Sequence, residues 1–111
     1  MNELCAFCQI ASNPDLERER IVFENEKYLG MQVLHPETKN HFIVFPKVHA
    51  NELLEMPNKG DFFETGVQLS EEKIKEYGAR AYVLKLNNNI YKFENDPMHV
   101  GHTHMHVIPR Y

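Results

Sequence analysis

Apolar residues along the chain occur in short runs separated by polar turns, and their spacing changes from strand-like to helix-like and back. Five such runs predict strands, at residues 21–23, 28–33, 41–45, 81–86 and 100–108. The first two flank a polar turn at residues 24–27, which predicts a β-hairpin. The third run is bounded by Asn40 and Pro46 and suits the interior of a sheet.

Two segments predict helices. Residues 3–12 predict a short N-terminal helix, and residues 61–77 predict one long helix that Gly78 stops and that Gly66 and Ser70 weaken. Apolar side chains at helical spacing give the long helix an inward face, at Phe63, Val67, Ile74 and Tyr77. Short links among the first three strands favour an α+β fold with a five-stranded, mostly antiparallel sheet.

The chain of 111 residues is long enough for one hydrophobic core, so residues 1–111 predict a single domain. Its formal charge of −4, with acidic and basic residues interspersed, excludes the basic stripe that binding of long nucleic acid requires. No run approaches the roughly 18 apolar residues of a membrane span, and no secretory leader pattern opens the sequence. We therefore expect no membrane partner and a cytoplasmic location.

Three histidines, His102, His104 and His106, stand at two-residue spacing in the last apolar run. In a strand such residues share one face about 6.6 Å apart, so the run predicts a single row of imidazoles. Imidazole rings can transfer protons, attack phosphorus or bind a metal near neutral pH. The alternative is three exposed histidines on the polar face of an amphipathic strand.

A second group of residues, Cys5-Ala6-Phe7-Cys8, is a C-x-x-C pair. A redox dithiol would follow a buried strand, and residues 1–4 leave no room for one. Two thiolates and two neutral imidazoles instead complete a tetrahedral, charge-neutral zinc site. The pair therefore favours zinc, with imidazoles from His41, His49 or the last strand. Two unmodified buried thiols are the alternative.

Residues 102–111, His-Thr-His-Met-His-Val-Ile-Pro-Arg-Tyr, resemble the histidine-triad signature of the HIT nucleotide hydrolases and transferases. Agreement extends upstream in the family's order, at residues 5–10, 22–26, 41–49 and 86–89. The resemblance implies a five-stranded antiparallel sheet with two helices, commonly paired into a homodimer with one continuous ten-stranded sheet. It also implies a small nucleotide or another phosphorylated compound as the partner.

Zinc-containing bacterial members of this family imply roles for the cysteines and histidines. By this resemblance one structural zinc ion would have four protein ligands, Cys5, Cys8, His49 and His102. His104 resembles the family's nucleophile, a neutral ring that would attack phosphorus to give a phosphoramidate that water then cleaves. His106 resembles the third triad member, which contacts the phosphate or leaving group, and Asn88 resembles the asparagine that helps hold the phosphate.

Two positions depart from the family pattern. The ribose-binding Asp at the end of the second strand corresponds to Val33, which implies weak or altered ribose recognition. Asp96-Pro97-Met98-His99 replaces a phosphate-binding Gly-Gln-Ser or Gly-Gln-Thr segment, and its proline removes one amide donor. His99 either contacts phosphate in place of the missing hydroxyl or is a solvent-facing loop residue.

These observations predict a hydrolase or transferase that cleaves a nucleoside phosphoramidate or phosphoanhydride through a nucleotidyl intermediate on His104. His104 and His106 are the predicted catalytic residues, and Asn88, His99 and His106 are the predicted substrate-binding residues. The alternative is a zinc-stabilised nucleotide-binding or interaction module that keeps the histidines but has lost or altered catalysis.

Overall fold

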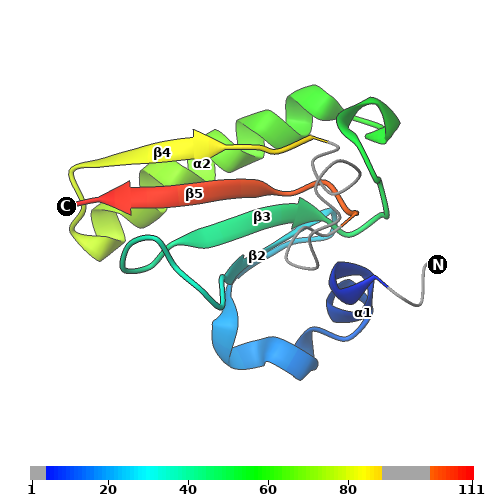
Figure 1. The fold of residues 1–111 in the computed structure, drawn as a ribbon, viewed down its shortest axis with the longest axis horizontal. Coiled ribbons are helices and arrows are strands. Elements are labelled where there is room, and N and C mark those ends of the chain that lie inside the picture. The colour runs from blue at the N-terminus through cyan, green and yellow to red at the C-terminus, as the bar shows by residue number, and fades with distance from the viewer. Residues whose placement is uncertain (1–4, 89–100) are drawn as a thin grey trace.

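The computed structural model describes residues 5–88 and 101–111, which form an antiparallel sheet with the long helix along one face (Figure 1). The strands are β1 (Ile21–Glu24), β2 (Tyr28–Gln32), β3 (Phe42–Pro46), β4 (Ala81–Lys85) and β5 (Met105–Arg110). The helical segments are α1 (Ala6–Ser12), α2 (Lys59–Tyr77) and two 3₁₀ turns, η1 (Pro14–Arg20) and η2 (Leu53–Glu55). Strands follow the order β1-β2-β3-β5-β4, and every neighbouring pair is antiparallel. The predicted α+β fold with a five-stranded sheet is therefore confirmed.

The central strand β3 is buried on both sides, so its continuous apolar run contributes to two clusters. Phe42 and Val44 pack in one cluster with Phe62 of α2. Ile43 and Phe45 point to the opposite face and pack in a second cluster with the apolar residues of α1. Helix α2 thus covers one face of the sheet, and the short helix α1 covers part of the other.

The ends of α2 are set by local hydrogen bonds. Asn58 precedes the helix, and its Oδ1 accepts a hydrogen bond from the Asp61 backbone N–H at 3.1 Å, which satisfies one unpaired donor of the first turn. Gly78 adopts a left-handed conformation with φ 73° and ends the helix, as predicted. Across residues 5–88 and 101–111, no helix combines the length and the apolar character that crossing a bilayer requires.

The buried face of α2 differs from the predicted one. Its buried residues are Phe62, Gly66, Leu69, Ser70 and Ile74. Phe63 and Val67, predicted to face inward, are 41% and 43% exposed. The apolar spacing was a poor guide because small residues line the contact with β5: a Cβ added at Gly66 would lie 2.6 Å from Met105 Sδ. Gly66 therefore serves close packing in the middle of the helix.

The last strand begins at Met105, five residues later than predicted at position 100, and only His106 of the three histidines lies in it. The preceding segment bonds to the end of β3 and the loop beyond it: the Thr103 N–H donates to Ala50 O at 2.7 Å, and His102 Nε2 lies 2.8 Å from Pro46 O. The prediction of one strand-borne row of three imidazoles is therefore wrong. These bonds separate His102 from the other two rings.

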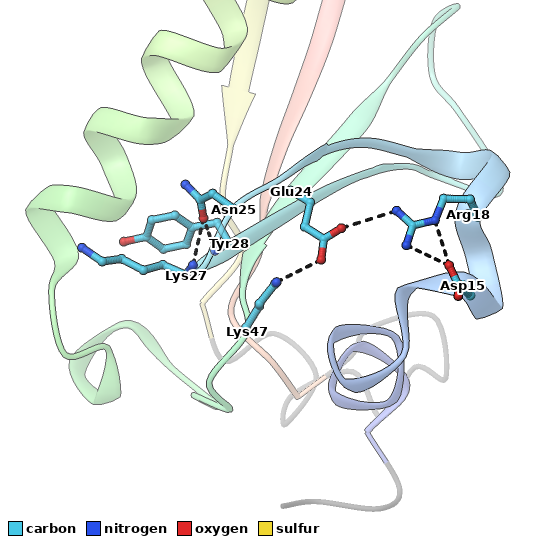
Figure 2. Close-up of polar contacts among 7 residues, drawn as sticks. All are labelled: Asp15, Arg18, Glu24, Asn25, Lys27, Tyr28 and Lys47. Carbon is cyan, nitrogen blue, oxygen red and sulfur yellow. Dashed lines mark hydrogen bonds and ion pairs between the residues drawn. The ribbon is translucent and has the colours of Figure 1, made fainter.

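The turn between β1 and β2 is stabilised by Asn25, whose Oδ1 accepts a hydrogen bond from the Tyr28 backbone N–H at 2.8 Å (Figure 2). Beside this turn, Glu24 pairs with Lys47 at 3.1 Å and with Arg18 of η1 at 3.4 Å (Figure 2). Ion pairs this accessible to solvent add little stability. They nevertheless tie η1 and the end of β3 to the same hairpin.

Candidate active site and metal centre

Four side chains with zinc-binding chemistry converge where α1, the loop after β3 and the segment before β5 meet: Cys5, Cys8, His49 and His102. Cys5 caps α1, and its Sγ accepts a hydrogen bond from the Cys8 N–H at 3.4 Å. Residues three apart on a helix lie on the same side, so this spacing brings the two thiols together. All four ligand atoms lie within 4.8 Å of one another.

The separations of these atoms are close to those around one tetrahedral zinc ion. Typical Zn–S and Zn–N bonds place the ligand atoms about 3.3 to 3.8 Å apart around such an ion. The Cys5 Sγ lies 3.3 Å from His102 Nδ1, and the Cys8 Sγ lies 3.1 Å from His49 Nδ1. The two Nδ1 atoms are 3.2 Å apart. Four protein ligands would leave no open position for a catalytic water, which is the arrangement of a structural site.

The outward-facing ring nitrogens of both histidines are also engaged. His102 Nε2 donates to Pro46 O at 2.8 Å, and His49 Nε2 donates to Asn51 Oδ1 at 2.7 Å. These bonds place the proton on Nε2 and direct the Nδ1 lone pair of each ring toward the cysteines. Burial lowers the pKa of His102 to about 4. A neutral ring is the form that a metal ion requires.

His104 and His106 lie apart from this cluster, on the face of the sheet that α1 partly covers. Their ring centroids are 5.0 Å apart, and His106 pairs across the ladder with Ile43 of β3. His104 Nδ1 lies 2.9 Å from His102 O. Because a carbonyl oxygen can only accept, Nδ1 must carry the proton, and the lone pair of the neutral His104 ring is then on Nε2. That tautomer suits a nucleophile.

His41 determines which ring nitrogen of His106 carries the proton. The Glu37 N–H donates to His41 Nδ1 at 3.0 Å, so the proton of the neutral His41 ring is on Nε2. His41 Nε2 lies 2.9 Å from His106 Nδ1, which must therefore accept, leaving the His106 proton on Nε2. Burial lowers the pKa of His41, which favours the neutral ring that this chain of bonds requires. His106 Nε2 is thus arranged as a hydrogen-bond donor beside His104.

Both rings line a cavity of about 380 Å³. Its wall is mostly apolar, with Phe7 and Ile10 from α1, Met31 and Ile43 from the sheet, and Val33 directly after β2. The remaining lining residues are Ala6, Glu17, Arg20, Leu34, His35 and His41. A mostly apolar cavity with a few converging polar groups is the usual form of a small-molecule site.

Phe7 connects the cavity to the metal centre. Its ring stacks on Phe45 with centroids 4.5 Å apart. Phe7 also makes edge-on contacts with the rings of His102 and His104, with ring centroids 5.6 and 5.2 Å apart, respectively. One residue between the two cysteines therefore touches a ring of each group.

Of the two other predicted substrate-binding residues, the structure describes Asn88. Asn88 follows β4, and its Oδ1 accepts a hydrogen bond from the Leu53 N–H of η2 at 2.9 Å. His99 lies outside the described residues. Their contacts with phosphate stay predictions that rest on the family resemblance.

The structure adds residues that the sequence analysis did not place at the site. From the sequence, His41 was interpreted as a structural histidine at the start of the third strand or as one of several possible metal-binding histidines. Its link to His106 depends on the register of β3 and β5. Glu17, Arg20 and His35 reach the cavity from η1 and from the loop after β2. Neither segment has a periodic pattern, so nothing local in the sequence indicates which way these side chains point.

A five-stranded antiparallel sheet that presents a histidine pair beside a Cys₂His₂ cluster defines a histidine-triad domain. The HIT domain family matches residues 16–111 of this chain. An uncharacterised HIT-like protein of Methanocaldococcus jannaschii is 33% identical over 109 residues, covering 97% of this chain and 80% of that protein. The chain belongs to the HIT family.

Two further relatives carry chemical information. A zinc-bound histidine triad family protein of Mycobacterium smegmatis superposes with a TM-score of 0.75 and 27% identity, covering 97% of this chain and 76% of that one. A bifunctional adenosine 5′-phosphosulfate phosphorylase/adenylylsulfatase of Arabidopsis thaliana is 35% identical over 49 residues, or 44% of this chain and 32% of that protein. The chain is thus related to zinc-containing and to nucleotide-cleaving members of the family.

Proposed function

We propose that this protein cleaves a nucleoside phosphoramidate or a nucleoside phosphoanhydride in two steps, with His104 as the nucleophile. The observation that carries the proposal is the 2.9 Å contact from His104 Nδ1 to His102 O, which leaves the lone pair on Nε2. An imidazole in this form attacks phosphorus without first losing a proton.

In the first step His104 Nε2 forms a bond to phosphorus, and the bond from phosphorus to the leaving nitrogen or oxygen breaks. His106 Nε2–H donates a hydrogen bond to the departing nitrogen or oxygen, because the bond from His41 keeps this hydrogen on His106 Nε2, and solvent water supplies the proton that the leaving group gains. In the second step water attacks phosphorus, the bond to His104 breaks, and a nucleoside monophosphate leaves. Asn88 and His99 remain candidate phosphate contacts on the family resemblance.

The cavity and the relatives support a nucleotide as the substrate. The apolar wall can hold a base, and the two rings stand at one side of the same cavity. The Arabidopsis relative is described as acting on adenosine 5′-phosphosulfate, in which a nucleoside phosphate bears a leaving group. We extend that chemistry here to the broader class of activated nucleoside monophosphates.

Zinc has a structural role in this proposal. Cys5, Cys8, His49 and His102 would hold one ion, which would join α1, the loop after β3 and the segment before β5. When bound, the ion would supply stability at this junction and would take no part in the reaction, since four protein ligands would complete its coordination. Thiolate ligands of this kind suit the reducing cytoplasm, which is where we place the protein.

We also propose a homodimer formed along β4. This strand lies at one edge of the sheet, and its Val83 and Leu84 are each 38% exposed. Phe63 and Val67 of α2 are exposed as well. Two such edges paired antiparallel would cover these side chains and give one ten-stranded sheet. Sedimentation of the purified protein should show a species of twice the chain mass.

The decisive experiment compares two substitutions with adenosine 5′-phosphoramidate as substrate. His104→Ala should reduce turnover to background while zinc content and thermal stability stay at wild-type values. His102→Ala should lose zinc and stability together. A substrate-derived adduct that survives rapid denaturation on wild-type protein, and is missing from His104→Ala, would identify the nucleophile.

Full turnover by His104→Ala would refute this mechanism. Tight nucleotide binding by the wild-type protein without any turnover would instead support the alternative of a zinc-stabilised binding module.

A further inference from the structure

The cavity beside His104 and His106 contains one carboxylate among its described lining residues, that of Glu17. Glu17 lies in η1, at the point where the backbone leaves helical geometry with φ −134° and ψ 36°. Its side chain is 37% exposed, so a bound molecule could reach it. The sheet wall near it is apolar, with Met31 and Val33 offering no side-chain acceptor.

Arg20 holds this carboxylate in place. Its Nε and one terminal nitrogen donate to Gln32 O at 3.0 and 2.8 Å, which fixes the guanidinium on the last residue of β2. The other terminal nitrogen lies 3.3 Å from Glu17 Oε1. Because Val33 follows Gln32, the carboxylate is anchored beside the apolar end of β2. These contacts engage three of the five N–H groups of Arg20, which also lines the cavity.

We propose that Glu17 accepts the hydroxyl groups of a ribose cis-diol and makes this site selective for nucleotides with an intact ribose. The proposal rests on the proposed function, since it names the sugar of the nucleotide cleaved there. A carboxylate has about four lone-pair positions, and the contact with Arg20 occupies only part of them. Two adjacent hydroxyls need acceptors of this kind when they leave water for an apolar cavity.

The charge on Glu17 also sets which part of the nucleotide it can approach. The carboxylate would repel a phosphate, which would bind at His104 and His106 instead. A sugar hydroxyl is neutral and donates to an ionised acceptor with a strong, short hydrogen bond. The cavity thus separates into a phosphate end at His104 and His106 and a hydroxyl-accepting edge at η1.

The test is calorimetric binding of adenosine 5′-monophosphate and of its 2′,3′-dideoxy analogue to the full chain. We expect wild-type protein to prefer the ribonucleotide by about tenfold, or 1.4 kcal/mol. Glu17→Met keeps the length of the side chain and removes the acceptor, so the preference should fall to within about twofold. Glu19→Met is the matched control, because Glu19 is exposed on the same segment and does not line the cavity.

The ratio of the two affinities separates selectivity from a merely structural role, which would weaken both ligands equally. A wild-type protein that binds both nucleotides alike, or a Glu17→Met protein that keeps the full preference, would overturn the assignment of Glu17. Either result would leave the proposed function intact if adenosine 5′-phosphoramidate is still cleaved through His104. Failure to bind or cleave any nucleotide would overturn both.

Discussion

The bond between His41 and His106 gives a sharp test of how protons are arranged at this site. His41→Leu removes the donor that lies 2.9 Å from His106 Nδ1 and also the acceptor of the Glu37 N–H. Glu37 is exposed, so water can replace that second bond. The main expected consequence is that His106 loses its preference for carrying the proton on Nε2.

The size of the effect follows from that single bond. A neutral hydrogen bond contributes about 1 kcal/mol net, which is roughly fivefold in the balance of two tautomers. Loss of a group that itself transfers the proton to the leaving group would cost about 10² to 10⁴ in rate. We therefore expect His41→Leu to lower kcat/KM five- to tenfold, on the order of 1 kcal/mol.

The assay compares two leaving groups on the same adenosine 5′-phosphoryl group. A basic alkylamine leaves as a neutral molecule only if it gains a proton, so its release should show the full decrease. A p-nitrophenolate leaves without one, so its release should be unchanged. His41→Gln, whose amide can still donate to His106, should stay within about twofold of wild type.

The same reasoning predicts how the effect depends on pH. Burial lowers the pKa of His41 from its ordinary value of about 6.5, so the ring remains neutral at and above that pH. The decrease caused by His41→Leu should therefore be constant from about pH 6.5 to 8. A thousandfold loss with both leaving groups, or no loss with the amine, would refute a positioning role for His41.

Two further predictions concern the buried residues near the metal centre. Elemental analysis of the wild-type protein should find one zinc ion per chain. Cys5→Ser should lower both the zinc content and the melting temperature, because metal binding and folding are coupled. A folded wild-type chain with no metal would contradict this. Thr103→Val should raise the unfolding free energy by about 1 kcal/mol in urea, since Thr103 Oγ1 is buried without a hydrogen-bond partner among the described residues; a destabilised variant would show that this hydroxyl has a partner.

Local patterns in the sequence were enough to predict the sheet and the presence of both helices. The hairpin of β1 and β2, the buried run of β3 and the end of α2 at Gly78 each depend on neighbouring residues. The inward face of α2 was predicted wrongly because Met105 lies so close to the helix that position 66 has room for glycine but not for an apolar side chain. Such a contact joins distant segments and leaves no periodic signal.

Some features of the candidate site could likewise be predicted from the sequence, and others depend on contacts between distant segments. The cysteine pair is encoded by one helical turn, and the histidines that join it were indicated by the family resemblance. The separation of His102 from His104 and His106 could not be read from their even spacing, because it arises from bonds to Pro46 and Ala50. Glu17 reaches the cavity from an irregular turn, for which spacing predicts no direction.

Helix α1 has seven residues, whereas isolated helices shorter than about 12 to 15 residues are marginal in water. Its cysteines face the metal cluster, and its Phe7 and Ile10 form part of the cavity wall. Metal and nucleotide would therefore both stabilise α1 in its packed position against the sheet. Thermodynamic reciprocity then requires that the nucleotide raise the affinity for zinc by the same factor by which zinc raises the affinity for the nucleotide. When zinc is scarce, molecules engaged with substrate should be the last to give up their metal.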